Sequence, residues 1–396
     1  MDIKMHAKQL DDKIIAHRRW FHRHPELSFE ERETTAYIVK ELTRLDIEAT
    51  TFSDYNGAIG TICGSNPGKT VMLRADIDAL PTNEATGLPF ASENPGKMHA
   101  CGHDCHAAML LGAAEILSQC RQSLFGTVKL LFQSAEESCF GARYYVEKGY
   151  MNDADALFGC HVWGSMQAPL MNIQDGYRMA SCDNFKIIIH GCATHGSTPH
   201  LGHDAVMAAS AIILNLQTFA SRRNDPLNPL VITVGTVKGG TQFNIITDRV
   251  ELEGTIRTFS RDIQPTIEPG IRKIITDTAS ALGCTAELVY DAIEGPVINE
   301  HIRLNSIARA AAIKLYGAKS LCDMSPVTGS EDFSVLMQKT PGVFGFLGCL
   351  NPALGIVYPN HSDKFTVDES ILHRGAALYA QFAVDYLEST AKGGNA

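Results

Sequence analysis

Two kinds of hydrophobic pattern alternate along the first 181 residues. Short continuous apolar runs are typical of strands buried on both faces of a sheet, and longer stretches with apolar residues three or four positions apart are typical of helices. An alternation of strands and helices indicates an α/β layered domain. The strands are predicted at residues 57–64, 71–80, 127–137 and 155–163, and the helices at 14–21, 34–45, within 99–120 and at 141–149.

Turn-forming residues predict the boundary between the first two helices. Pro25, in the segment HPELSFEE, cannot continue a helix, so the first helix is expected to end there. Ser28 is followed three residues later by Glu31, which fits a capping box at the start of the next helix.

The pattern changes near residue 182 and changes back near residue 292. Between these points the predicted order is strand, helix, strand, strand, helix, strand, which is the split βαβ or ferredoxin-like arrangement. The chain then ends in a helix over 369–388 and a polar tail, AKGGNA, predicted to be disordered. The predicted fold is therefore an α/β body with a mixed sheet flanked by helices, formed by residues 1–181 and 293–396, with an inserted α+β module at 182–292.

Composition and charge exclude several classes of protein. The formal net charge is −10 and no cluster of Lys and Arg occurs, whereas binding to nucleic acid needs such clusters. No apolar stretch approaches the ~20 residues of a membrane span, and the N-terminal residues lack the apolar run of a signal peptide. A cytoplasmic location is therefore expected, with the eleven scattered cysteines reduced.

The segment HACGHDCH carries the strongest local chemical signal. Cys101 and His103 lie two residues apart, beside Gly102, where a loop turns into a helix, and their side chains can reach one cation. A buried cysteine beside a helix-capping turn is an equally good interpretation of this segment alone. A redox or zinc-knuckle pair of Cys101 and Cys105 is a weaker one, because the spacing is not that of C-x-x-C.

Further donor groups follow the ends of predicted strands. Glu136 and Glu137 end the strand 127–137, and His161 ends the strand 155–163. Singly, these residues are also compatible with a solvated acidic turn and a core histidine. As a set with one more histidine, their N, S and O donors suit two divalent ions with positions left for water. The predicted ligands are Cys101, His103, Glu137, His161 and His361.

Several longer blocks resemble one protein family. The sequence is similar to the aminoacylase/carboxypeptidase metallopeptidase superfamily, in its amidohydrolase branch with hippurate hydrolases and indoleacetyl-amino-acid hydrolases. The resemblance runs in the family's order from residue 18 to residue 369, and it implies a zinc-exopeptidase-like body. The blocks are RRWFHRHPELSFEE, RADIDALP, MHACGHDCHAAMLLGAA, AEES with the following FGA, HGSTPH, VELEGTIRTF, GSEDFS and NHSDKFTVDE.

The resemblance implies an activity and roles for individual residues. It implies hydrolysis of N-acyl amino acids, with Glu136 as general base and with His195 donating a hydrogen bond to the reacting oxygen of a neighbouring subunit's substrate. Asn244 and Arg257 would hold the substrate's α-carboxylate, and Asp76 would orient a metal ligand. The inserted module would be a lid that also makes a homodimer or higher homo-oligomer.

The metal and the substrate stay open at this point. The donor set admits zinc or manganese, with cobalt or nickel as alternatives. A dipeptidase or carboxypeptidase would use the same centre, and a metal-binding protein without activity or a thiol redox protein remain as alternatives of another class. Cys192 to Thr194 and Thr247 depart from the family pattern at positions that bear on substrate preference and not on the reaction.

Overall fold

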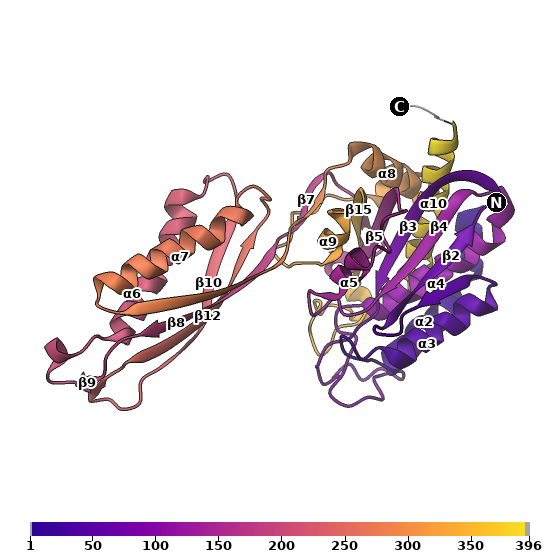
Figure 1. The fold of residues 1–396 in the computed structure, drawn as a ribbon. Coiled ribbons are helices and arrows are strands. Elements are labelled where there is room, and N and C mark those ends of the chain that lie inside the picture. Colours follow the sequence, from indigo (N-terminus) through magenta and orange to yellow (C-terminus); the bar gives the residue numbers. More distant parts are fainter. Residues whose placement is uncertain (1, 393–396) are drawn as a thin grey trace. The chain divides into compact units, whose positions relative to one another are not determined.

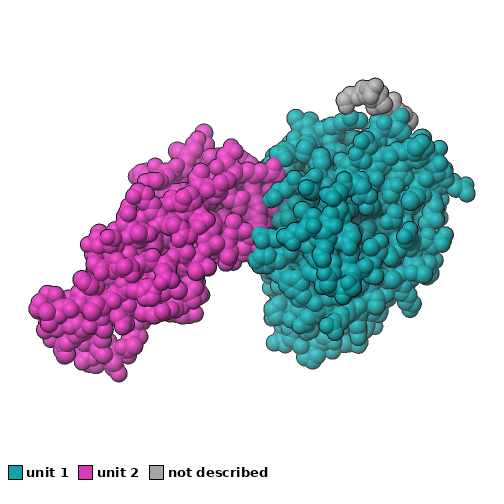
Figure 2. Space-filling model, viewed as in Figure 1, with its two compact units in different colours: residues 1–176, 298–325, 335–396 teal, residues 177–297, 326–334 magenta. Residues whose placement is uncertain are grey.

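The chain folds into two compact units, shown in different colours in Figure 2. The structure is a computed structural model and describes residues 2–392. The first unit contains residues 1–176, 298–325 and 335–396, and the second contains residues 177–297 and 326–334. The second unit is therefore inserted into the first, and a short later segment also belongs to it.

The first unit is built on a mixed seven-stranded sheet (Figure 1). Its four central strands are parallel to one another, and each outer strand is antiparallel to the neighbour on its inner side. Parts of the chain on either side of the insertion share this sheet, as the α/β pattern predicted. In spatial order the strands are β1 (Glu48–Thr51), β2 (Gly57–Cys63), β4 (Phe125–Gln133), β3 (Asn66–Asp76), β5 (Ala156–Gln167), β15 (Gly342–Leu350) and β6 (Met171–Asn172).

Helix α4 (His103–Gln119) lies at the centre of the first unit's helical layer. It packs against α2 (Asp11–Arg23), α10 (Leu372–Lys392) and strand β3. Nearly all its side chains are buried, which explains why its sequence is apolar on every side. Helix α10 extends beyond the predicted end at residue 388, and residues 393–396 of the predicted tail lie outside the described residues. The other helices around this sheet are α1 (Ile3–Gln9), α2 (Asp11–Arg23), α3 (Arg32–Arg44), α5 (Gly141–Glu147), α8 (Ile302–Tyr316) and α10 (Leu372–Lys392).

The predicted capping box at the start of α3 is wrong. Ser28 donates a hydrogen bond of 2.7 Å to the Asp78 carboxylate instead of capping the helix. The carboxylate of Glu26 accepts hydrogen bonds from the backbone N–H groups of Glu33 and Thr34 in its place. The first helix ends at Arg23, before the proline as expected, and is divided from α1 at residue 10.

The second unit has the predicted split βαβ topology. Its four strands form one antiparallel sheet in the order β10-β12-β8-β13, and α6 and α7 pack on each other and on the sheet. A separate two-stranded ladder joins β9 (Thr194–His195) to β11 (Ile245–Ile246). The main elements are β8 (Cys182–His190), α6 (Ala205–Thr218), β10 (Leu230–Gly239), β12 (Arg249–Thr258), α7 (Gln264–Ala281) and β13 (Thr285–Glu294).

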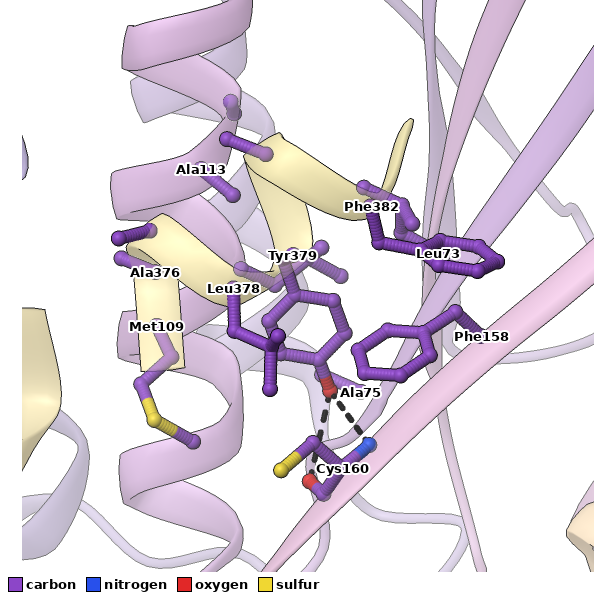
Figure 3. Close-up of a cluster of buried hydrophobic side chains, with 14 of the residues drawn as sticks. Leu73, Ala75, Met109, Ala113, Phe158, Cys160, Ala376, Leu378, Tyr379 and Phe382 are labelled. Carbon is purple, nitrogen blue, oxygen red and sulfur yellow. Dashed lines mark hydrogen bonds between the residues drawn. The ribbon is translucent and has the colours of Figure 1, made fainter. Parts of the chain in front are cut away.

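Figure 3 shows a polar connection within the core of the first unit, between the hydroxyl of Tyr379 and the backbone of Cys160. Strands β3 and β5 pair as far as Arg74 and Gly159 and then separate. The buried hydroxyl of Tyr379, on α10, lies where they separate: it donates to Arg74 O at 2.8 Å and accepts from Cys160 N at 3.0 Å. It therefore replaces a direct bond between the two strands. Among residues 2–392, no helix is both long and apolar enough to span a membrane.

Candidate metal centre

The predicted ligands of the first unit converge at one edge of its sheet. Strands β3, β4 and β5 are parallel, so their carboxyl ends meet there, where ligands bind in open α/β sheets. The N-terminal end of α4 reaches the same edge. Gly102, just before α4, has φ +96°, and a Cβ atom there would lie 2.3 Å from a methyl carbon of Val162. Glycine is therefore required where Cys101 and His103 turn toward the site.

The five predicted ligands form two groups that share a cysteine. Cys101, His103 and His161 place one donor atom each within 4.8 Å of one another, and so do Cys101, Glu137 and His361. The sulfur of Cys101 is 3.4 Å from His161 Nε2, and His361 Nε2 is 3.5 Å from Glu137 Oε1. Cys101 is thus the donor common to these two neighbouring groups.

Unpaired donor atoms and the local charge both fit a cation. His103 Nε2 and Glu137 Oε1 are buried without a hydrogen-bond partner, and they lie 3.9 Å apart. Burial alone would lower the pKa of His103, but the carboxylates of Asp76 and Asp78 raise it to about 10. Burial and the charge of Asp78 raise the pKa of Glu137 to about 7. Such a negative, buried cluster is stabilised by a divalent ion, so the residues fit the metal that the sequence implies.

Asp78 has the orienting role that the sequence pattern assigned to Asp76. The carboxylate of Asp78 accepts a hydrogen bond of 3.1 Å from His103 Nδ1, which directs Nε2 into the site, and another of 2.9 Å from the backbone N–H of Glu137. Asp76 instead accepts hydrogen bonds from Arg74 and from Nδ1 of His106. Asp78, two residues further along the chain, therefore makes the direct contact to His103.

The turn that carries the two glutamates is held in an unusual backbone conformation. Strand β4 ends before this turn, and Ala135 has φ +63°, which is uncommon for a residue with a side chain. The buried carboxylate of Glu31 accepts a hydrogen bond of 2.8 Å from Ala135 N and one of 2.6 Å from the Ser134 hydroxyl. Burial and the charge of Asp78 raise the pKa of Glu31 to about 7. Glu136 lies next in the chain, with its carboxylate 3.8 Å from His103 Nε2.

Asn360 fixes the loop that presents His361. Its side-chain N–H group donates to the carbonyls of Cys101 at 2.9 Å and Val162 at 3.2 Å, and its carbonyl accepts from Gly164 N at 2.8 Å. The loop is thus joined both to the segment before α4 and to β5. The side chain of His361 is 57% exposed, so this predicted ligand lies at the open side of the site.

The other three predicted site residues belong to the second unit. His195 is in the β9–β11 ladder, and Gly196 N donates a hydrogen bond of 2.7 Å to Asn244 O, so these two predicted residues are neighbours. Ser197 N donates to His195 Nδ1, which leaves the proton on the exposed Nε2 atom. Arg257 lies on β12.

Three residues at this edge were not among the functional candidates predicted from the sequence: Glu31, Asp78 and His106. Asp78 follows Asp76 at a spacing of two, and His106 follows His103 at a spacing of three, on the same face of α4. These spacings are weak signals, because the loop and helix geometry decides which residue of each pair reaches the site.

The fold and this edge of the sheet define a dinuclear metallohydrolase. The chain matches the sequence model of Peptidase family M20/M25/M40 over residues 72–385 and belongs to this family. Thermostable carboxypeptidase 1 of Saccharolobus solfataricus is 38% identical over 389 residues, covering 97% of this chain and 98% of that protein. N-acetyl-L-cysteine deacetylase of Bacillus subtilis is 36% identical over 380 residues, covering 96% and 89%.

A solved structure agrees with the fold. The Bacillus subtilis YXEP protein, described as a dinuclear metal binding peptidase from the M20 family, has 35% sequence identity and a TM-score of 0.85, covering 96% of this chain and 99% of that one. The family resemblance and the predicted fold class are confirmed.

Proposed function

We propose that this protein hydrolyses the amide bond of N-acyl amino acids to a carboxylic acid and a free amino acid. The observation that carries the proposal is the pair of ligand groups sharing Cys101, with the carboxylate of Glu136 beside them. A metal-binding protein without activity would need the ligands but not Glu136. The similarity to a deacetylase and to a carboxypeptidase supports cleavage of amides.

Two divalent ions would be held by the two groups. Cys101, His103 and His161 would hold one ion, and Cys101, Glu137 and His361 the other. Zinc or manganese is proposed, with cobalt or nickel as alternatives, because thiolate, imidazole and carboxylate donors suit all four. When bound, such ions supply an activated water and polarise a carbonyl group.

Glu136 is the proposed general base. Its carboxylate takes the proton of the attacking water and returns it to the leaving amine. A positioned proton-transfer group of this kind contributes roughly 10²–10⁴-fold to the rate. The bonds of Glu31 to Ser134 and Ala135 keep the turn before it in place, so the carboxylate needs no rearrangement.

Residues of the second unit are proposed to bind substrate. His195 has its proton on Nε2 and would donate it as a hydrogen bond to the developing oxyanion at a neighbouring subunit's site. Arg257 and Asn244 would hold the free α-carboxylate, for which a planar guanidinium is well suited.

A homodimer through the second unit is proposed. Helix α6 contains no charged residue, yet its outer face exposes 45% of Val206, 59% of Met207 and 72% of Leu214. Strand β10 is at the edge of the four-stranded sheet on which α6 packs, and it exposes Val231 and Val237. An apolar helix face beside an unpaired strand edge is suited to self-association.

Subunit mixing tests this arrangement. Subunits carrying His195→Ala and Glu136→Gln are each expected to be inactive. If His195 acts across the dimer, random mixing restores one complete site in half of the dimers, or about a quarter of wild-type activity. No recovery in verified mixed dimers would place His195 in its own subunit's site or outside the reaction.

The activity itself is tested with a substrate panel. The wild type is assayed before and after chelation on N-acetyl, N-benzoyl and indoleacetyl amino acids and on free dipeptides. The variant Glu136→Gln is assayed on the same panel, and Glu147→Gln, on α5, is the control. We expect cleavage of N-acyl amino acids that chelation abolishes and zinc or manganese restores, with Glu136→Gln inactive and still loaded with metal. Full activity of the chelated protein or of Glu136→Gln would reject the mechanism.

A carboxypeptidase or dipeptidase is the second candidate function. The similarity to thermostable carboxypeptidase 1 is the observation that favours it. Turnover of dipeptides with no turnover of N-acyl amino acids in the same panel would establish it.

A further inference from the structure

A histidine that is not among the proposed ligands fills the opening between β3 and β5. After the last paired residues, Arg74 and Gly159, the Tyr379 hydroxyl occupies the first gap between the strands. Further along, the gap is wider and is filled by the side chain of His106, which is 1% exposed. His106 Nδ1 lies 2.5 Å from Asp76 Oδ1, at the end of β3, and His106 Nε2 lies 2.8 Å from Val162 N, on β5.

These two bonds fix the protonation of the His106 ring. The backbone N–H of Val162 can only donate, so Nε2 of His106 must accept and carries no proton. The remaining proton is then on Nδ1, which donates it to Asp76. His106 is therefore a neutral imidazole in one tautomer, and neither ring nitrogen has a lone pair left for a metal.

The same bonds determine where His161 lies. His161 donates from Nδ1 to the carbonyl of Val162 at 2.6 Å, so its ring is tied to the residue that His106 holds. The rings of His106 and His161 also pack edge to face, with centroids 4.5 Å apart. His161 Nε2 is thereby directed to within 3.4 Å of the Cys101 sulfur.

We propose that His106 is a positioning residue of the metal centre: it bridges Asp76 and the Val162 amide and so holds the ligand His161 in place. Asp76, His103 and His106 also lie close enough together to suggest a separate metal position, but the two bonds of His106 exclude it as a ligand. The positioning role rests on the proposed metal centre. The placement of the His106 proton on Nδ1 follows from the two hydrogen bonds alone and holds without metal.

The tautomer is tested by NMR on protein labelled with ¹⁵N in histidine. Long-range ¹H–¹⁵N spectra are recorded for the metal-free and the metal-loaded wild type, and the His106 signals are identified by their loss in His106→Asn. We expect the proton on Nδ1 in both states, with little change at His106 Nε2 on loading. A large shift of that nitrogen on metal binding would make His106 a ligand and overturn the proposal.

The positioning role is tested by cobalt titration, with absorption spectra and steady-state kinetics. His106→Asn and His106→Gln are compared with the ligand variant His103→Asn and with His17→Asn, a buried histidine on α2 that hydrogen-bonds to Tyr37. Loss of an orienting partner typically weakens metal binding or activity by about 10–100-fold. Both His106 variants should therefore still bind two ions, but more weakly, with altered cobalt spectra and lower kcat. His103→Asn should bind fewer than two ions, and His17→Asn should bind two ions with wild-type affinity.

Two results would overturn the positioning role. One is wild-type metal affinity and kcat in both His106 variants. The other is saturation of these variants with a single ion, which would indicate a lost ligand. If the wild type itself bound no second ion, the proposed function would fail, and the tautomer of the metal-free protein would still decide whether His106 joins the two strands.

Discussion

Removal of the Tyr379 hydroxyl tests whether one buried oxygen holds the separating strands together. Tyr379→Phe removes the acceptor of Cys160 N–H, a bond that Figure 3 shows, and the donor to the Arg74 carbonyl. Both residues are buried, so water cannot replace the lost partner. A buried donor or acceptor without a partner costs about 1–3 kcal/mol. For two such groups, less the desolvation cost of the removed hydroxyl, we expect the free energy of unfolding to fall by about 2–4 kcal/mol.

Tryptophan fluorescence during urea denaturation of the metal-free protein measures this loss. The two tryptophans, Trp20 and Trp163, both lie in the first unit, so the signal follows the unit that contains Tyr379. Tyr386→Phe is the matched control, because Tyr386 is also buried on α10 and its hydroxyl has no hydrogen bond to a described residue. The control should change stability by no more than about 0.5 kcal/mol. Equal stability of the two variants would refute the reasoning.

Three further changes test the surroundings of the site. Glu31→Gln removes one of the two hydrogen-bond acceptors that hold the glutamate turn, so kcat should fall by roughly 10–100-fold with metal content unchanged; unchanged kcat would contradict this. Asp104→Asn leaves Arg18, 1% exposed, with the less buried Glu369 as its remaining ionic partner. It should lower the free energy of unfolding by about 3 kcal/mol in urea denaturation, the low end for breaking a buried pair, and unchanged stability would contradict this. Burial lowers the pKa of His17 to about 4, whereas its value in the unfolded chain is about 6.5. Because the unfolded chain takes up the proton first, the free energy of unfolding decreases as the pH is lowered below about 6.5. Between about pH 7.5 and pH 5 the wild type should lose about 2 kcal/mol more than His17→Gln, and parallel pH profiles would reject this.

Much of the fold follows from local pattern. The period of the apolar residues predicted the main elements of the first 181 residues and of the inserted module, but not α8 and β15, which follow the insertion. The order of the elements in the module predicted the split βαβ sheet, because each element must bury one face or stripe. The strand over 127–137 was predicted too long, since β4 ends at Gln133 and the glutamates lie in a turn. Apolar patterning does not record where a backbone leaves the sheet.

The sequence alone determined which donor groups were available, and it placed Glu136 and Glu137 at the end of a strand. It did not show that His161 lies within β5. It did not determine which of Asp76 and Asp78 orients His103, nor that Cys101 is shared by two groups of ligands. Those outcomes depend on distances of a few ångström between segments that are far apart in the chain. Such distances are set by how helices pack on the sheet, and in particular by the buried side chains that separate β3 from β5.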